Sequence, residues 1–113
     1  MLARPYRLRK SSDILRLYKQ GQRAHTRWLV VYSRANHLGE SRATVVVAKK
    51  VDKRATVRNR NRRRVGEWLR TSWSQIAPGF DILVSIKSDI RELTATELQA
   101  ELVAGLRKLG VWK

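Results

Sequence analysis

Lysine and arginine side chains crowd into one stretch of the chain, residues 49–70, and the chemistry they offer is the binding of phosphate groups. These 22 residues hold ten of the 25 basic side chains and two carboxylates. Cations at this density repel one another unless a polyanion neutralises them. Arginine suits such a partner, because its planar guanidinium donates two parallel hydrogen bonds to a phosphate group. The stretch therefore predicts contact with a nucleic acid.

Two asparagines, Asn59 and Asn61, lie among these arginines. Their amides donate and accept hydrogen bonds, so we expect them to contact riboses or base edges. A solvated charge run is the usual interpretation of such a segment, but it would not explain the asparagines.

The basic stretch favours a helix from about Ala55 onward. Val65, Leu69 and Ser72 then share one face, with Trp68 at its edge. Toward the N-terminus the same face meets polar and charged residues. We therefore expect the C-terminal half of this helix to pack on the domain. The N-terminal half is predicted to project as a cationic rod whose free N–H groups also attract phosphate.

Residues for catalysis are not evident in the chain. The nine carboxylates are scattered, without the spacing of a metal site or of an acid–base pair. His25 and His37 fall in expected loop or strand-edge positions, and we interpret both as ordinary surface residues. The chain has no cysteine, no glycine-rich phosphate loop and no nucleophile motif. We predict no catalytic residue and no metal ligand in it.

The size and composition favour one small domain. The chain has 113 residues, of which 42% are hydrophobic, and it includes four tryptophans, which is enough for a core despite the net charge of +16. No apolar segment is long enough for a membrane span or a secretory signal. We expect a cytoplasmic nucleic-acid-binding protein, residues 1–113, with residues 1–10 as a flexible basic arm.

The elements that position these residues are predicted from hydrophobic periodicity. Ser11 or Ser12 is expected to cap a short helix that ends at Gly21, with the apolar side chains of its face packed on the core. These are Ile14, Leu17 and Tyr18, of which Tyr18, with its hydroxyl and aromatic ring, could equally lie at an edge of the core.

Three strands are predicted, at residues 26–34, 42–48 and 81–87. We expect the first two to form an antiparallel hairpin, with the valines of the second in a central strand. A turn at residues 77–79 precedes the third strand. Thr94 and Glu97 form a capping box for a final helix, which Gly110 closes.

The predicted order is helix, strand, strand, helix, strand, helix, with one further short strand that we do not place. This is an α+β fold, with a sheet of three or four strands. Helices on one face would leave the other partly open, where Tyr32 or Trp28 could stack on bases.

The chain resembles the protein component of bacterial ribonuclease P. The centre of the family pattern is an Arg-Asn-Arg run followed by further basic residues, which Arg58, Asn59, Arg60, Arg62 and Arg63 match. The resemblance also covers residues 7–21, the strand that ends in Tyr32, residues 47–64, the Pro-Gly-Phe-Asp turn and the final helix.

This resemblance implies a compact α/β sandwich, with about four strands in a mixed sheet, three helices and a left-handed βαβ crossover, as in one ribosomal protein domain. It implies an endoribonuclease only as a holoenzyme. The partner is a catalytic RNA that uses Mg²⁺ to remove the 5′ leader of precursor tRNA. The protein would bind that RNA and the leader, and no DNA.

Site residues follow from the resemblance by position. Contact with the catalytic RNA is implied for Lys53, Arg54, Arg58, Asn59, Arg60, Arg62 and Arg63. A leader-binding cleft between the first helix and the sheet is implied for Ile14, Tyr18, Tyr32, Lys49 and Lys50.

Four residues depart from the family pattern. Ile14 stands where an aromatic side chain is usual, which makes Tyr18 and Tyr32 the stacking candidates. Asn61 and Arg64 stand where apolar residues are common, and Gly66 replaces an arginine at a cost to the helix of roughly 1 kcal/mol relative to alanine. The alternative to this family is a structural RNA-binding protein of the ribosomal type, with no role in cleavage.

Overall fold

One four-stranded mixed sheet organises the molecule, whose computed structural model describes residue 2 and residues 4–113. The strands, in the spatial order β1-β2-β4-β3, are β1 (Gln22–His25), β2 (Leu29–Ala35), β3 (Arg42–Val47) and β4 (Phe80–Ile86). The α-helices are α1 (Ser11–Gln20), α2 (Ala55–Thr71) and α3 (Ala95–Lys108). Short 3-10 helices are η1 (Arg4–Tyr6), η2 (Lys49–Val51) and η3 (Trp73–Gln75). The predicted α+β class, with three helices and four strands, is confirmed.

The pairing of the strands differs from the expected hairpin. β2 and β3 flank β4 on opposite sides, β2 antiparallel to it and β3 parallel. The predicted hairpin between residues 26–34 and 42–48 is therefore wrong, and the valine-rich strand lies at the edge of the sheet. β4 takes the centre because its side chains are apolar on both faces. Helix α2 makes the crossover from β3 to β4, and the left-handed sense of that crossover stays a prediction.

The short strand that the sequence did not place is β1. It pairs antiparallel with β2, with His25 opposite Val30 and Arg23 opposite Tyr32. Of its four residues only Ala24 is buried, so its sequence carries no alternation of apolar side chains. Its pairing with β2, and not its own composition, makes it a strand.

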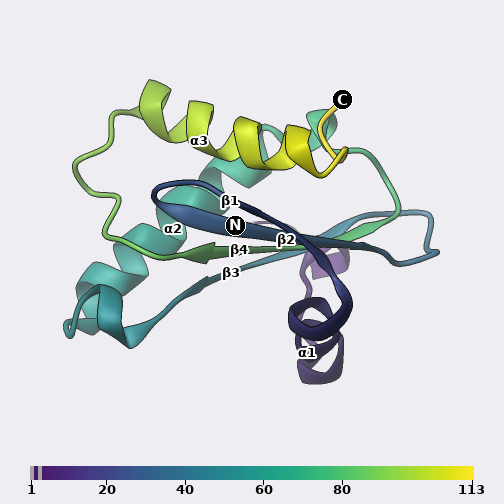
Figure 1. The fold of residues 1–113 in the computed structure, drawn as a ribbon, viewed down its shortest axis with the longest axis horizontal. Coiled ribbons are helices and arrows are strands. Elements are labelled where there is room, and N and C mark those ends of the chain that lie inside the picture. The colour runs from purple at the N-terminus through teal and green to yellow at the C-terminus, as the bar shows by residue number, and fades with distance from the viewer. Residues whose placement is uncertain (1, 3) are drawn as a thin grey trace.

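The two faces of the sheet are buried unequally (Figure 1). Helices α2 and α3 cover one face, where a core cluster includes Leu29, Val31, Ile82, Val84 and Ile86 from the sheet. Helix α1 lies on the other face, over a small cluster of Leu8, Leu17 and Leu83. The side chains of Ile14, Tyr32 and Val46 are only partly buried at the margin of that cluster. The second face is therefore partly open, as predicted, but the expectation of helices on one face alone is wrong, because α1 lies on this second face.

Helix α1 is fixed by its ends and by one ion pair. It begins at Ser11, and Lys10 holds the capping position without a side-chain cap, so the predicted serine cap is wrong. The carbonyl of Lys10 accepts the N–H groups of Asp13 and Ile14. It ends at Gly21, where a Cβ atom would lie 2.6 Å from the carbonyl oxygen of Leu17. Only glycine permits this close approach.

The guanidinium of Arg42 connects α1 to the sheet. It donates two hydrogen bonds to the carboxylate of Asp81, at 2.9 and 2.8 Å, and lies 3.6 Å from the carboxylate of Asp13 in α1. The bond to Asp81 raises the pKa of Arg42. Asp81 also accepts a hydrogen bond from Asn36. This buried carboxylate therefore binds the β2–β3 loop directly and α1 through Arg42.

One face of helix α2 packs on the domain along the whole length of the helix, so the predicted projecting rod is wrong. Val57 and Asn61 are 3% and 1% exposed, and they continue the buried face of Val65 and Leu69 into the first turns. The amide of Asn61 donates to the carbonyl of Val57 and to the carboxylate of Asp89, and accepts from the N–H of Ile90. A fully hydrogen-bonded asparagine can occupy a core position, which the periodicity of apolar residues does not reveal.

Arg64 serves the same loop. Its guanidinium donates to the carbonyl of Ile90 at 2.6 Å and to the carbonyl of Leu93. Both of these residues are buried in the larger core. Asn61 and Arg64 thus bind the β4–α3 loop to α2, which explains two departures from the family pattern as structural residues.

The C-terminal helix begins and ends as predicted. The Thr94 hydroxyl accepts from the N–H of Glu97 while the Glu97 carboxylate accepts from the N–H of Thr94, which is a complete capping box. Gly110 follows the helix with φ of +73°, a backbone conformation that favours glycine. Leu98, Leu102 and Leu106 are buried under it.

The described part of the N-terminal arm lies against the domain. Leu2 and Leu8 are buried, and the N–H of Leu8 donates to the carbonyl of Ala43 at 2.9 Å. The rings of Tyr6 and Trp73 lie 5.7 Å apart. The flexibility expected of residues 1–10 stays a prediction, and part of that segment falls outside the described residues.

Replacing Asn61 tests its structural role. We expect Asn61→Leu to lower the free energy of unfolding by about 1–3 kcal/mol, because the buried N–H of Ile90 loses its acceptor. Urea unfolding followed by tryptophan fluorescence measures this. The matched control is Asn59→Leu, two residues away on the exposed side of α2, which should change stability much less. Equal effects of the two substitutions would contradict the assignment.

Candidate nucleic-acid interface

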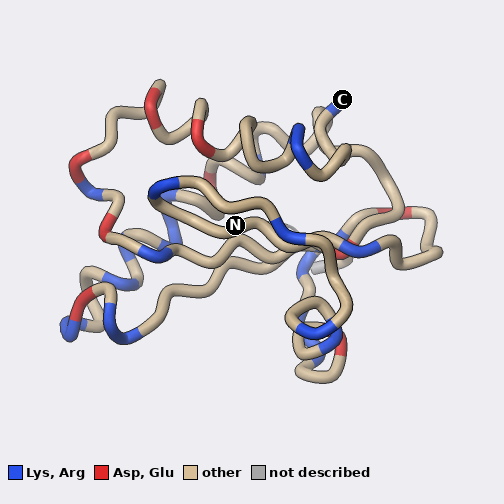
Figure 2. Tube along the Cα trace, in the orientation of Figure 1, with Lys and Arg blue, Asp and Glu red and all other residues tan. Residues whose placement is uncertain are grey.

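The residues predicted to bind RNA fall on two separate surfaces. The first, which we name the α2 surface, is formed by Lys53, Arg54, Arg58, Asn59, Arg60, Arg62 and Arg63. The second, which we name the open sheet face, is the partly covered side of the sheet around Ile14, Tyr18 and Tyr32. Figure 2 shows basic segments on α1 and on the turn before α2, and acidic segments on α3.

Four side chains of the α2 surface bind other groups of the protein. The guanidinium of Arg54 donates bidentate hydrogen bonds to the carboxylate of Asp52, at 3.1 and 3.0 Å. Arg58 donates to the carbonyls of Asp52 and Lys53, and Arg62 donates to the side-chain oxygen of Asn59 at 2.6 Å. These contacts hold the turn before α2 and the first turns of the helix in shape.

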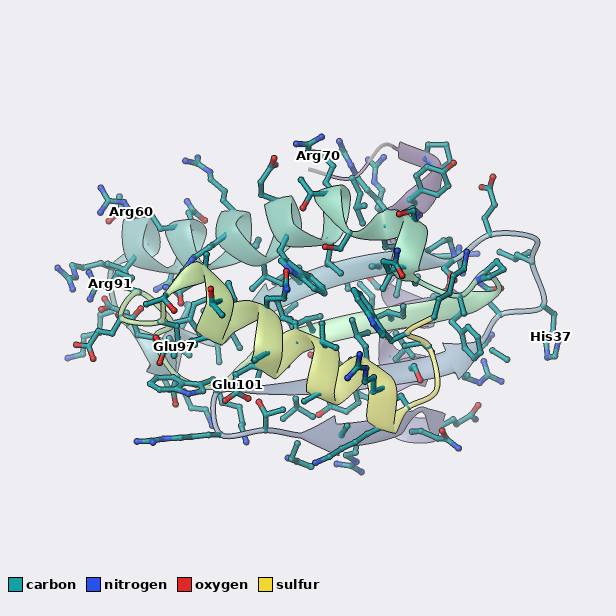
Figure 3. The ribbon with its side chains drawn as sticks, turned by 90° about the horizontal axis from the view of Figure 1, so that it is seen from above. His37, Arg60, Arg70, Arg91, Glu97 and Glu101 are labelled. Atoms are coloured by element: carbon teal, nitrogen blue, oxygen red, sulfur yellow. The ribbon has the colours of Figure 1, made fainter. Side chains whose placement is uncertain are left out.

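The other cations of the α2 surface have no partner among the described residues. They are Lys53, Arg60 and Arg63, and all are exposed. Figure 3 shows Arg60 directed away from the body of the molecule. Because a phosphate would not have to displace an existing bond, these side chains are the most available for an RNA backbone.

The carboxylate of Asp52 shapes the electrostatics of this turn. It accepts hydrogen bonds from the side chain and the N–H of Arg54, which lower its pKa to about 2. It also lies 4.0 Å from the guanidinium of Arg91. Asp52 therefore stays charged at neutral pH and orients Arg54 along the turn.

Two tyrosines meet on the open sheet face. The rings of Tyr18 and Tyr32 lie 5.0 Å apart in an edge-to-face arrangement, and the guanidinium of Arg23 lies 5.9 Å from the centre of the Tyr32 ring. Tyr18 is 38% exposed, which leaves its ring the more accessible. Burial, and then the neighbouring Tyr32, raise the pKa of Tyr18, so its ring stays neutral at pH 7.

The open sheet face includes residues that sequence reasoning missed. Strand register places Arg23 beside Tyr32, and His25 beside Val30, on this side of the sheet. Both belong to β1, which the sequence did not predict. Trp28, the other proposed stacking residue, packs instead against the larger core, with Arg27 over its ring at 5.3 Å, so that prediction is wrong.

Lys49 and Lys50 are not brought beside the tyrosines. Both are exposed in η2, while α1 lies at the other end of the sheet (Figure 1). Tyr32 is level with Leu83 and Thr44 across the sheet. Lys49 follows Thr44 by five positions, which at the rise of an extended strand is about 16 Å. The two lysines therefore lie beyond the end of β3, away from Tyr32 at the middle of β2.

In the described part of the chain, the acids and histidines do not gather into a metal-binding group. His37 lies in the β2–β3 loop at the end of the molecule opposite Arg60 (Figure 3). Among the described residues, no three His, Asp or Glu side chains gather so that they could hold a metal ion. Within the same part of the chain, no helix combines the length and apolarity that a membrane span requires.

The family model and the similar sequences all name the same family. The family model described as Ribonuclease P matches residues 2–110. The ribonuclease P protein component of Roseiflexus castenholzii is 35% identical over 111 residues, which cover 97% of this chain and 90% of that one. The ribonuclease P protein component of Cyanothece sp. is 31% identical, with 90% of each chain covered.

Solved structures show the same likeness in the fold. The RNase P protein of Staphylococcus aureus superposes with a TM-score of 0.83 at 29% identity, covering 96% of this chain and 98% of that one. The RNase P protein of Thermotoga maritima superposes with a TM-score of 0.78 at 30% identity, covering 87% and 92%. The arrangement of one mixed sheet and three helices is thus shared over nearly the whole chain.

Proposed function

This chain belongs to the bacterial ribonuclease P protein family and is a component of the ribonuclease P holoenzyme. We propose that it contributes to the holoenzyme by binding the catalytic RNA and the 5′ leader of precursor tRNA on its two separate surfaces. The observation that carries this proposal is the separation of the α2 surface from the open sheet face, because one small domain can then contact two RNA segments at once. The reaction is endonucleolytic removal of the leader, which leaves the mature tRNA 5′ end.

The α2 surface binds the catalytic RNA. Lys53, Arg60 and Arg63 pair with its phosphates, while Arg54, Arg58 and Arg62 keep the turn and the helix in the shape that presents them. Asn59 lies on the exposed side and is available to riboses or base edges. Asn61 has no such role, since its amide is buried and fully bonded.

The open sheet face binds the leader as an extended single strand. A base stacks on the exposed ring of Tyr18, and Arg23 can leave the Tyr32 ring for a phosphate so that a second base stacks there. Ile14 contributes apolar contact between α1 and the sheet. Lys49 and Lys50 receive phosphates at the far end of the face.

The chain supplies no catalytic group, and the Mg²⁺ ions of the reaction belong to the RNA subunit. The protein lowers the repulsion between the catalytic RNA and its substrate, because its cations neutralise phosphates of both. This raises the affinity of the assembly for precursor tRNA and for metal. We place the protein in the cytoplasm, with neither DNA nor a membrane as partner.

Reconstitution tests the proposed function directly. A 5′-extended precursor tRNA is incubated at low Mg²⁺ with a bacterial ribonuclease P RNA alone, with this protein alone, and with both. We expect efficient cleavage at the mature 5′ end only with both, because the protein contributes binding and the RNA contributes chemistry. Tight RNA binding without any stimulation would instead favour a structural RNA-binding role.

A charge substitution on the α2 surface tests the docking of the catalytic RNA. We expect Arg63→Ala to weaken binding of ribonuclease P RNA and to reduce the slope of log affinity against log salt by about one unit, with no change in melting temperature. Arg58→Ala should also lower the melting temperature, because Arg58 holds two carbonyls of the turn. The control is Lys108→Ala, which removes the same charge from the end of α3. Equal effects of the Arg63 and Lys108 substitutions on affinity would contradict a defined α2 surface.

A truncation on the open sheet face tests leader binding. We expect Tyr18→Ala to weaken holoenzyme binding of precursor tRNA roughly tenfold, a stacking effect, and to leave mature tRNA binding unchanged. Leu15→Ala is the matched control, since Leu15 lies on the same helix but is 54% exposed and outside the small cluster. Affinities are measured under conditions that prevent cleavage. A similar loss for both tRNAs would remove the leader assignment.

A further inference from the structure

We propose that a hollow between α2, β3 and the N-terminal segment receives one unstacked nucleotide of the RNA partner, with the base on an apolar floor and the phosphate at an arginine rim. This inference rests on the proposed function, because it requires that the α2 surface docks a structured RNA. It adds a site for a single extruded nucleotide to the phosphate contacts of the α2 surface.

The hollow has the size and lining of a small-ligand site. Its volume is about 480 Å³, within the range of cavities that hold small organic ligands. The apolar lining comes from Leu8, Ala43, Val45 and Leu69, of which Val45 is the only one that is not buried. The polar lining comes from the N-terminal segment, from β3 and from α2. A planar molecule with one charged end would contact all three segments.

Gly66 keeps the α2 wall of the hollow open. Asn59, Arg62, Arg63, Gly66 and Leu69 follow one another at helical spacing and all line the hollow. Apart from its chain neighbours and the backbone of its own helix, a Cβ atom at Gly66 would have no atom within 4 Å, so the protein itself does not require glycine there. Glycine is a poor helix former, yet at this position it leaves space in front of the helix for a ligand.

The edge of β3 supplies hydrogen-bonding groups to the same space. The carbonyl of Ala43 points away from β4, because it accepts the N–H of Leu8 from the arm. Strand geometry turns the N–H and C=O of Val45 in the same direction. The pairing of the arm with β3 consists of one isolated bridge, between Arg7 and Ala43, so the arm does not cover Val45. One adjacent donor and acceptor match the donor–acceptor edge of a nucleobase.

The rim of the hollow is cationic. Arg9 of the arm and Arg63 of α2 are exposed and have no partner among the described residues, and both line the hollow. A phosphate alone would use the rim but not the apolar floor, and an apolar ligand would use the floor but not the rim. A nucleotide uses both, which is why we infer a nucleotide and not a simple anion.

Filling the hollow from Gly66 tests the proposal in the assembled holoenzyme. Gly66→Leu should fold with a melting temperature at or above that of the wild type, because its side chain enters open space and leucine favours helix. We expect it to weaken binding of ribonuclease P RNA about tenfold with an unchanged salt slope, since no phosphate contact is removed. Gly66→Ala, which improves the helix without filling the hollow, is the matched control. Wild-type affinity in Gly66→Leu would overturn the proposal.

A titration of the free protein separates this site from the proposed function. We expect AMP or UMP to shift the amide resonances of Val45 and Gly66, and expect ribose 5-phosphate, which has the same phosphate but no base, to shift them much less. Equal shifts by ribose 5-phosphate would show an anion site only and would overturn the nucleotide assignment. If the wild-type protein fails to bind ribonuclease P RNA, the proposed function fails, while this titration still decides whether the hollow accepts a base.

Discussion

The buried amide of Asn61 is the contact on which the placement of the basic helix depends. Helix α2 carries many of the positive charges of the chain, and burying such a helix along its whole length requires one face without charge. Val57, Val65 and Leu69 supply most of that face, and Asn61 completes it by bonding the loop between β4 and α3. Arg64 binds the same loop, so α2 is held to the segment that leads into α3. The cations on the other side of α2 are presented from a fixed backbone.

The opposite layer follows another principle. Helix α1 is short and covers a small cluster, so its position depends on the ion pairs of Arg42 with Asp81 and Asp13 as well as on packing. This limited coverage is what leaves the tyrosines accessible. A longer or more apolar α1 would bury more surface and stabilise the domain, but it would cover the strand face that we assign to the leader.

Local features of this chain could be read from its sequence, and partnerships between distant segments could not. Short-range patterns predict three features that the structure confirms: the capping box at Thr94 and Glu97, the apolar strand at residues 81–87, and the buried pair Val65 and Leu69. The strand pairing failed because alternation shows which residues form a strand and not which strand lies beside it. Asn61 and Arg64 were missed because a polar side chain in a core is defined by partners about 30 positions away. On the open sheet face, Arg23 was missed because β1 has almost no apolar pattern of its own.

The central position of β4 has a consequence for the order in which the protein can form during synthesis. β4 is the last strand in the sequence, yet it is the strand beside which β3 lies in the sheet, and it is the second partner of β2 after β1. Until residue 86 has left the ribosome, β3 has no complete partner strand beside it. The basic stretch that follows β3 then has no sheet to pack on. Contacts between such distant segments form slowly. The basic stretch therefore stays without its packing layer, beside the RNA of the ribosome itself, until β4 has been made.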